Sequence, residues 1–99
     1  MRLRWTELAE ADLENIETWI THENSPTVAL DVVLEVVDSA FRILGDHPGA
    51  GRIGRVKGTR ELVINGLPFI IVYRQGTDPG ELQLLRVLRT AQNWPGEER

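Results

Sequence analysis

Apolar side chains recur at two different spacings along the chain, and the spacing changes near the midpoint. Residues 2–5 alternate polar and apolar side chains, which predicts a short strand. From residue 7 to about residue 21, apolar positions recur every three or four residues and predict a helix. Thr6 suits the N-cap of this helix, because its hydroxyl can accept a hydrogen bond from the first turn. The side chains expected on or near its buried face are Leu8, Ala9, Leu13, Ile16 and Ile20.

A second helical pattern starts after Asn24 and stops at the sequence His47-Pro48-Gly49. Ser25 suits the N-cap, and Pro26 suits the first helical position, where a missing N–H is harmless. The tight break between the two helices predicts an antiparallel hairpin. The side chains expected to face the core are Ala29, Val33, Val36, Val37, Ala40 and Leu44, with Val32 and Phe41 beside them.

Beyond Gly51 the pattern is typical of strands. Residues 60–64, 68–74 and 81–89 predict three strands, separated by turn sequences at residues 65–66 and 77–80. The chain therefore predicts one α+β domain over residues 1–99. We expect an N-terminal strand, an antiparallel helix hairpin, and a mainly antiparallel strand meander in one sheet, with the helices on one sheet face.

Composition narrows the classes of protein. The 99 residues include no cysteine, which excludes disulfides, a thiolate nucleophile and a cysteine zinc site. Charged residues near the N-terminus stand where a secretion signal would be apolar, and no apolar run is long enough to cross a bilayer. We therefore expect a cytoplasmic protein that does not enter membranes.

Charge is divided between the two halves of the chain. Residues 1–50 carry three basic and ten acidic residues, whereas residues 51–99 carry eight basic and five acidic residues, for an overall net charge of −4. This division indicates either two faces with different partners or a solvated surface whose charges segregate by element.

Standard catalytic motifs are missing from the sequence. No glycine-rich loop opens a helix after a strand, and the serines have no base close in sequence. His22 and His47 fall near the ends of predicted helices, where the helix dipole favours an imidazole. We therefore expect no metal and no cofactor.

Cations concentrate in the strand half of the chain: Arg52, Arg55, Lys57, Arg60, Arg74, Arg86 and Arg89. Arg86 has apolar neighbours, so we expect it to pair with Glu61 or with an acid of the first helix; a substrate contact is the alternative. Tyr73 and Trp94 are interpreted as half-buried core aromatics, with base stacking as the alternative.

Three segments of the chain share their pattern with one known family. The first combines Trp5, Ala9, Asp12, Leu13, Ile16 and Ile20. The second comprises residues 48–52, 58–62 and 68–74, and the third spans residues 85–95. Together they resemble the RelE/ParE toxins of type II toxin–antitoxin systems, over nearly the whole chain and in the same order. The resemblance implies a toxin that a cognate antitoxin wraps and neutralises in a hetero-oligomer.

The family divides by target, and the resemblance implies the ParE-like branch, whose members poison DNA gyrase and have no known catalytic residues. RelE-like members instead cut mRNA on the ribosome. Some of these nucleases carry an arginine near the position of Ile70, and some use a histidine as acid–base where this chain has Arg89. Arginine stays protonated at physiological pH, so Arg89 cannot act as a general base. The acidic net charge also disfavours binding to ribosomal RNA.

Three functions therefore remain open: a gyrase inhibitor, a ribosome-dependent mRNA endonuclease, and an inactive relative that only binds its partner. For the nuclease, Arg60, Arg86 and Arg89 are the candidates to hold phosphate, with Tyr73 stacking on a base. For antitoxin binding, the candidate residues are Arg52, Arg55, Arg60, Arg89 and Trp94.

Overall fold

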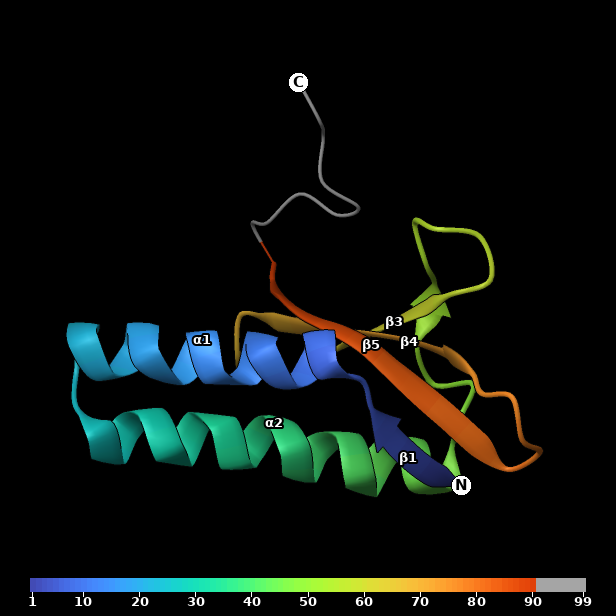
Figure 1. Cartoon of the computed structure of the whole chain (residues 1–99), viewed down its shortest axis with the longest axis horizontal. Coiled ribbons are helices and arrows are strands. Elements are labelled where there is room, and N and C mark those ends of the chain that lie inside the picture. Colours follow the sequence, from blue (N-terminus) through green and yellow to red (C-terminus); the bar gives the residue numbers. More distant parts are fainter. Residues whose placement is uncertain (91–99) are drawn as a thin grey trace.

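The computed structural model describes residues 1–90, which form two helices and one five-stranded sheet (Figure 1). The elements are β1 (Arg2–Trp5), α1 (Glu7–Glu23), α2 (Pro26–Asp46), β2 (Arg52–Ile53), β3 (Arg60–Val63), β4 (Phe69–Gln75) and β5 (Glu81–Arg89). The strand order is β1-β5-β4-β3-β2. β1 runs parallel to β5, and the other neighbours are antiparallel. The predicted α+β fold, with a helix hairpin and a mainly antiparallel sheet, is confirmed.

Local signals set the ends of the helices as expected. The Thr6 hydroxyl accepts a hydrogen bond from the backbone N–H of Ala9 at 3.2 Å, and the Ser25 hydroxyl accepts one from Val28 at 3.1 Å. Gly66 adopts a φ of +82° in the turn between β3 and β4, a conformation that glycine adopts without steric cost. α1 extends two residues further than expected, to Glu23 rather than Thr21.

The short strand β2 was not predicted from the sequence. It has only two residues, Arg52 and Ile53, and both are exposed. A strand of this length shows no alternation, so its position is set by pairing with Glu61 and Arg60 of β3 rather than by its own sequence.

The core lies between the helix hairpin and one face of the sheet. Alternate residues of β4, namely Phe69, Ile71 and Tyr73, belong to the same buried cluster as the inner faces of the helices. The other members are Ile16, Ile20, Ala29, Val36, Ala40, Leu44, Leu62, Ile64, Leu82, Leu84 and Val87. This clustering confirms that the helices cover one sheet face.

Two apolar residues expected in or beside the core are exposed instead. Leu8 is 62% exposed and Phe41 is 69% exposed. In α2, Ala40 and Leu44 face the sheet, so Phe41, about 100° further around the helix, points away from it. The prediction for Leu8 was wrong for a similar reason, because the neighbouring Ala9 takes the buried position in the first turn.

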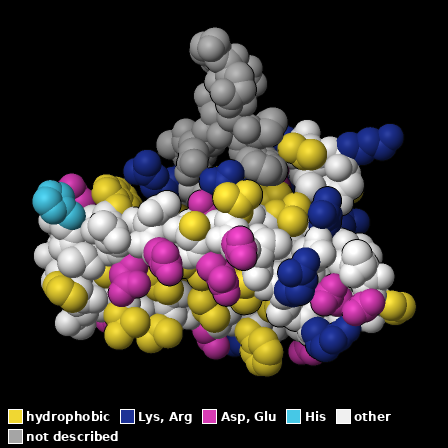
Figure 2. Space-filling model, viewed as in Figure 1, with side chains coloured by type: hydrophobic (Ala, Val, Ile, Leu, Met, Phe, Trp, Pro, Cys, Tyr) yellow, Lys and Arg dark blue, Asp and Glu magenta, His cyan; other side chains and the backbone are white. Residues whose placement is uncertain are grey.

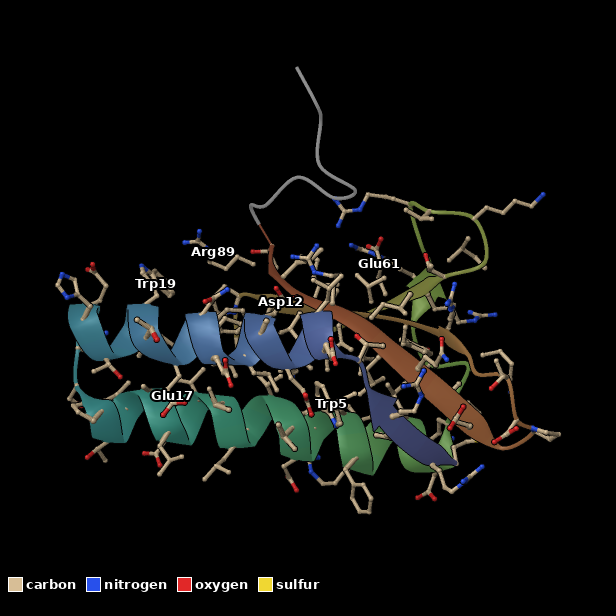
Figure 3. All side chains as sticks on the ribbon, viewed as in Figure 1. Trp5, Asp12, Glu17, Trp19, Glu61 and Arg89 are labelled. Atoms are coloured by element: carbon tan, nitrogen blue, oxygen red, sulfur yellow. The ribbon has the colours of Figure 1, made fainter. Side chains whose placement is uncertain are left out.

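One carboxylate of α1, that of Asp12, binds the edge of the sheet. β1 pairs with β5 only as far as Trp5 and Leu84, so the rest of β5 has no strand on that side. Asp12 of α1 lies against this free edge (Figure 3) and accepts a hydrogen bond from the backbone N–H of Val87 at 2.8 Å. Arg86 donates to the same carboxylate through Nε at 2.7 Å and through its terminal nitrogen at 3.0 Å.

The pairing of Arg86 with an acid of the first helix is thus confirmed, and the alternative partner Glu61 was wrong. Glu61 faces Val72 across the sheet, and Val72 faces Arg86, so a whole strand separates the two side chains. A β-bulge at Leu85 lies in β5 beside Arg86, since Tyr73 pairs with Leu84 and Val72 pairs with Arg86.

We predict that Asp12→Asn lowers the free energy of unfolding by about 1–3 kcal/mol, because the amide is uncharged and has one acceptor oxygen in place of two, which leaves its NH₂ group facing an N–H donor. Urea titration of the purified protein measures this difference. Glu14→Gln, on the exposed face of α1, is the matched control and should change stability by less than about 0.5 kcal/mol. Equal stability of the two variants would contradict the fastening role of Asp12.

Candidate functional site

The candidate site arginines of the strand half lie in two places rather than in one cluster. Arg52 and Arg60 belong to the β2–β3 end of the sheet, whereas Arg86 and Arg89 belong to β5 beside α1. In Figure 2, most acidic side chains in view lie along the helices, and Lys and Arg side chains gather mainly over the sheet. Trp94, a predicted partner contact, lies outside the described residues.

Glu61 binds two cations, Arg52 and Arg55, at the β2–β3 end of the sheet. Its side chain is only 1% exposed, and its two carboxylate oxygens accept from Arg52 at 3.0 Å and from the Arg55 side chain at 3.1 Å. The backbone N–H of Arg55 donates to the same carboxylate at 2.9 Å. The Arg52 and Arg55 side chains remain 58% and 42% exposed, so each can also reach a partner.

The charge of Glu61 is stabilised by these contacts. Burial alone would raise the pKa of its carboxyl group, but the hydrogen bonds from Arg55 and Arg52 outweigh burial and hold that pKa below its ordinary value. Glu61 is therefore ionised at neutral pH and fixes the segment between β2 and β3.

Tyr73 is a buried residue whose hydroxyl binds two backbone groups. Its hydroxyl accepts from the backbone N–H of Gly51 at 2.8 Å and donates to the carbonyl of Pro48 at 2.8 Å, and the residue is 1% exposed. A Cβ at Gly51 would lie 2.7 Å from the Tyr73 hydroxyl, so glycine is needed there. Arg60 donates to the Gly51 carbonyl at 2.8 Å. Of the two interpretations of Tyr73, the structure shows the core aromatic, with no ring face open to a base.

The second group of cations lies over α1. The Arg89 guanidinium lies 4.9 Å from the ring centroid of Trp19, a cation–π distance. Figure 3 shows Trp19 and Arg89 facing one another above the helix. This pair lines a small hollow of about 280 Å³ together with Asp12 and Arg86. Hydrogen bonding to Asp12 raises the pKa of Arg86 above its ordinary value, so Arg86 is a permanent cation and cannot transfer protons.

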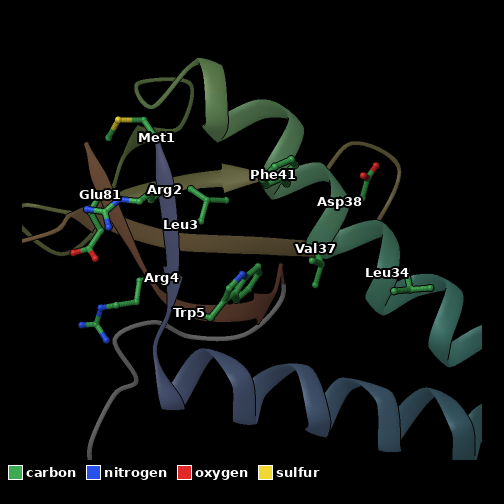
Figure 4. Close-up of a pocket in the computed structure, with 10 residues that line it drawn as sticks. All are labelled: Met1, Arg2, Leu3, Arg4, Trp5, Leu34, Val37, Asp38, Phe41 and Glu81. Atoms are coloured by element: carbon green, nitrogen blue, oxygen red, sulfur yellow. The ribbon is translucent and has the colours of Figure 1, made fainter. Parts of the chain in front are cut away.

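A larger hollow lies elsewhere, between β1 and α2 (Figure 4). It has a volume of about 930 Å³, and its walls include Leu3, Trp5, Leu34, Val37 and Phe41. Sequence reasoning missed this groove. Its signal is present, however, because Leu30, Leu34, Val37 and Phe41 follow a helical spacing offset from the core-facing residues of α2.

Two features are absent from residues 1–90. In that range, no three His, Asp or Glu side chains come close enough to hold a metal ion. Neither of the two described helices has the length and apolar character needed to span a bilayer.

We predict that Glu61→Gln lowers the free energy of unfolding at pH 7 by about 1–3 kcal/mol, because the Arg52 and Arg55 hydrogen bonds lose their charged acceptor. The folded pKa of Glu61 is depressed, so its contribution is complete above the unfolded pKa of about 4.3 and is lost as pH falls through the folded value. The gap between wild type and variant should therefore narrow in acid.

Chemical denaturation at a series of pH values measures this gap. Glu17→Gln, at an exposed position of α1, is the control and should track the wild type throughout. A gap for Glu61→Gln that stays constant down to strongly acidic pH would contradict the assigned role of the carboxylate.

Comparisons with known proteins agree with the fold. The family model described as "ParE toxin of type II toxin-antitoxin system, parDE" matches residues 3–94. "Putative toxin Y4kP" of Sinorhizobium fredii (strain NBRC 101917 / NGR234) is 38% identical over 94 residues, which cover 95% of this chain and 93% of the relative. The solved structure "Chromosomal ParDE TA system from P. aeruginosa" superposes with a TM-score of 0.78 at 33% identity, covering 90% of this chain and 95% of that chain. This chain belongs to the ParE toxin family of type II toxin–antitoxin systems.

Proposed function

We propose that this toxin acts by inhibiting DNA gyrase and that a cognate antitoxin neutralises it. The observation that carries the proposal is that three of the candidate nuclease side chains already form hydrogen bonds within the fold. Arg60 donates to Gly51, Arg86 is bound to Asp12, and the Tyr73 hydroxyl bridges Pro48 and Gly51. Catalysis of phosphate transfer needs cations directed at a reacting group, whereas an inhibitor that binds by its surface does not.

Two further features support binding rather than RNA cleavage. Ile70, near the position where some RNA-cleaving relatives carry an arginine, is 3% exposed and has no polar group. Arg89 lies where some nucleases of the family have a histidine, and it cannot accept a proton. The net charge of −4 also opposes a binding mode that is driven by neutralising phosphates.

An antitoxin partner is supported by the family and by the similar solved structure, which is of a ParDE toxin–antitoxin system. We propose that acids of this antitoxin pair with Arg52, Arg55, Arg60 or Arg89. The exposed parts of Arg52 and Arg55 are held in place by Glu61, so less side-chain entropy is lost when they bind a second carboxylate.

The first test measures supercoiling by gyrase in the presence of purified, antitoxin-free protein, with a translation extract assayed in parallel. We expect inhibited supercoiling or trapped cleavage complexes, and full-length mRNA in the extract. Protein premixed with its antitoxin is the control and should leave gyrase active.

Intact supercoiling together with cut mRNA would contradict the proposal and assign the chain to the ribosome-dependent nucleases. In that case Arg89→Ala should abolish cutting. No effect in either assay, with folded protein, would also contradict it and indicate a relative that only binds its partner.

The second test changes Arg60 and Arg89 together to glutamate and measures affinity for the antitoxin at rising salt. We expect weaker binding that fails at lower salt than the wild type, because attraction becomes repulsion at two contacts. Glu14→Gln serves as the control on the α1 face. Unchanged affinity and unchanged salt dependence would contradict the assignment of these arginines.

A further inference from the structure

The face of the sheet opposite the helices carries a band of exposed arginines. This arginine band comprises Arg4, Arg52, Arg55 and Arg74. Strand pairing places Arg4 of β1 beside Gln83 of β5, and Gln83 beside Arg74 of β4, in one row across the sheet. Successive residues of a strand point to opposite faces, so Arg4 lies opposite Leu3 and Trp5, which pack against the core (Figure 4). The row therefore belongs to the helix-free face.

The next row of the same face extends the band to the far edge of the sheet. Val72 of β4 pairs with Glu61 of β3, and Glu61 pairs with Arg52 of β2. Val72 lies two residues from Arg74 along β4, so both side chains point to the same face. Arg55 joins this row because its Nε donates to Glu61 at 3.1 Å. The band thus crosses a sheet whose five strands span about 19 Å at the usual strand spacing.

Arginine side chains supply the exposed surface along this band. The residues that lie between them are buried, since Gln83, Val72 and Glu61 are 6%, 0% and 1% exposed. Within residues 1–90, neither Arg4 nor Arg74 forms an ion pair. A protein partner would find no apolar side chain to bury here, whereas the phosphates of a nucleic acid need only cations and hydrogen-bond donors.

Acceptors within the fold hold three of these guanidinium groups in place. Glu61 accepts from Arg52 and Arg55, and the side-chain oxygen of Gln83 accepts from Nε of Arg74 at 3.0 Å. A guanidinium has five N–H donors, so each of the three keeps further donors for a ligand. Side chains that are already ordered lose less entropy when they bind. The band is therefore prepared for a row of anionic groups.

Exposed acidic groups lie mainly on the opposite layer. Glu61 and Glu81, which lie on the sheet face, are only 1% and 8% exposed. The exposed Asp78 lies 3.9 Å from Arg2, which is therefore not counted in the band. Figure 2 shows acidic side chains along the helices, and those exposed on α1 include Glu7, Glu10, Glu14 and Glu17. A polyanion is thus attracted to the sheet face and repelled by the helix face.

We infer, on the basis of the proposed gyrase inhibition, that the arginine band binds the phosphate backbone of the DNA that gyrase holds. With a net charge of −4 the chain binds DNA weakly alone, so the contact forms when gyrase holds toxin and DNA together. A toxin that contacts both binds their complex more tightly than it binds gyrase alone. It thereby stabilises the state in which gyrase remains on DNA.

The test measures the affinity of fluorescently labelled toxin for gyrase by anisotropy, with and without a DNA duplex long enough for gyrase to bind. DNA should strengthen wild-type binding at least about tenfold. The double variant Arg4→Gln, Arg74→Gln should lose most of this gain but keep its affinity for gyrase alone, because only phosphate contacts are removed. With DNA present, the slope of log affinity against log salt should become shallower by about two.

The matched control is the double variant Thr18→Glu, Thr27→Glu, at exposed positions of the two helices. It changes the net charge by the same amount as the arginine variant but leaves the sheet face intact, so it should keep the full gain from DNA. Circular dichroism establishes that both variants are folded. Equal loss of the gain in the two variants would assign the effect to total charge and overturn the inference.

The remaining outcomes separate the inference from the proposed function. Binding to gyrase that DNA does not strengthen, or a gain that the arginine variant retains, would overturn the inference and leave gyrase inhibition standing. Weaker binding of that variant to gyrase without DNA would assign the band to a protein contact and also overturn it. A wild type that binds gyrase neither with nor without DNA would overturn the proposed function as well.

Discussion

The carboxylate of Asp12 binds the part of β5 that has no neighbouring strand on the β1 side. β1 is shorter than β5, so the C-terminal half of β5 has no strand beyond it on that side. The same carboxylate binds the Val87 backbone N–H and two nitrogens of the Arg86 guanidinium, which connects α1 to the sheet across most of the sequence. Because α1 and α2 form one hairpin, this contact also orients α2 and the groove that α2 makes with β1.

Three arginines of the strand half, Arg52, Arg55 and Arg86, form ion pairs within the fold. Arg86 belongs to Asp12, and Arg52 and Arg55 surround Glu61, where their hydrogen bonds depress the pKa of a carboxyl group that burial alone would raise. The fold also retains exposed guanidinium surface at Arg52 and Arg55 and an apolar groove between β1 and α2.

The sequence predicted the elements that depend on local patterns. Thr6, Ser25 and Pro26 mark both helix starts, and short apolar runs bounded by turn sequences locate the three longer strands of the second half. It could not assign Arg86 to Asp12 rather than to Glu61, because that choice depends on where β1 stops beside β5. β2 was missed because two exposed residues carry no alternation. The groove was missed because Phe41 was interpreted from its apolar character alone, and its direction depends on which face of α2 meets the sheet.

The most direct test of the account measures DNA and RNA from the same cells after the toxin is expressed without its antitoxin. If the chain acts as a surface-binding inhibitor of gyrase, gyrase should be recovered covalently attached to DNA while transcripts remain full length. Transcripts cut within codons, with no gyrase bound to DNA, would show that the arginines act catalytically and would contradict the account.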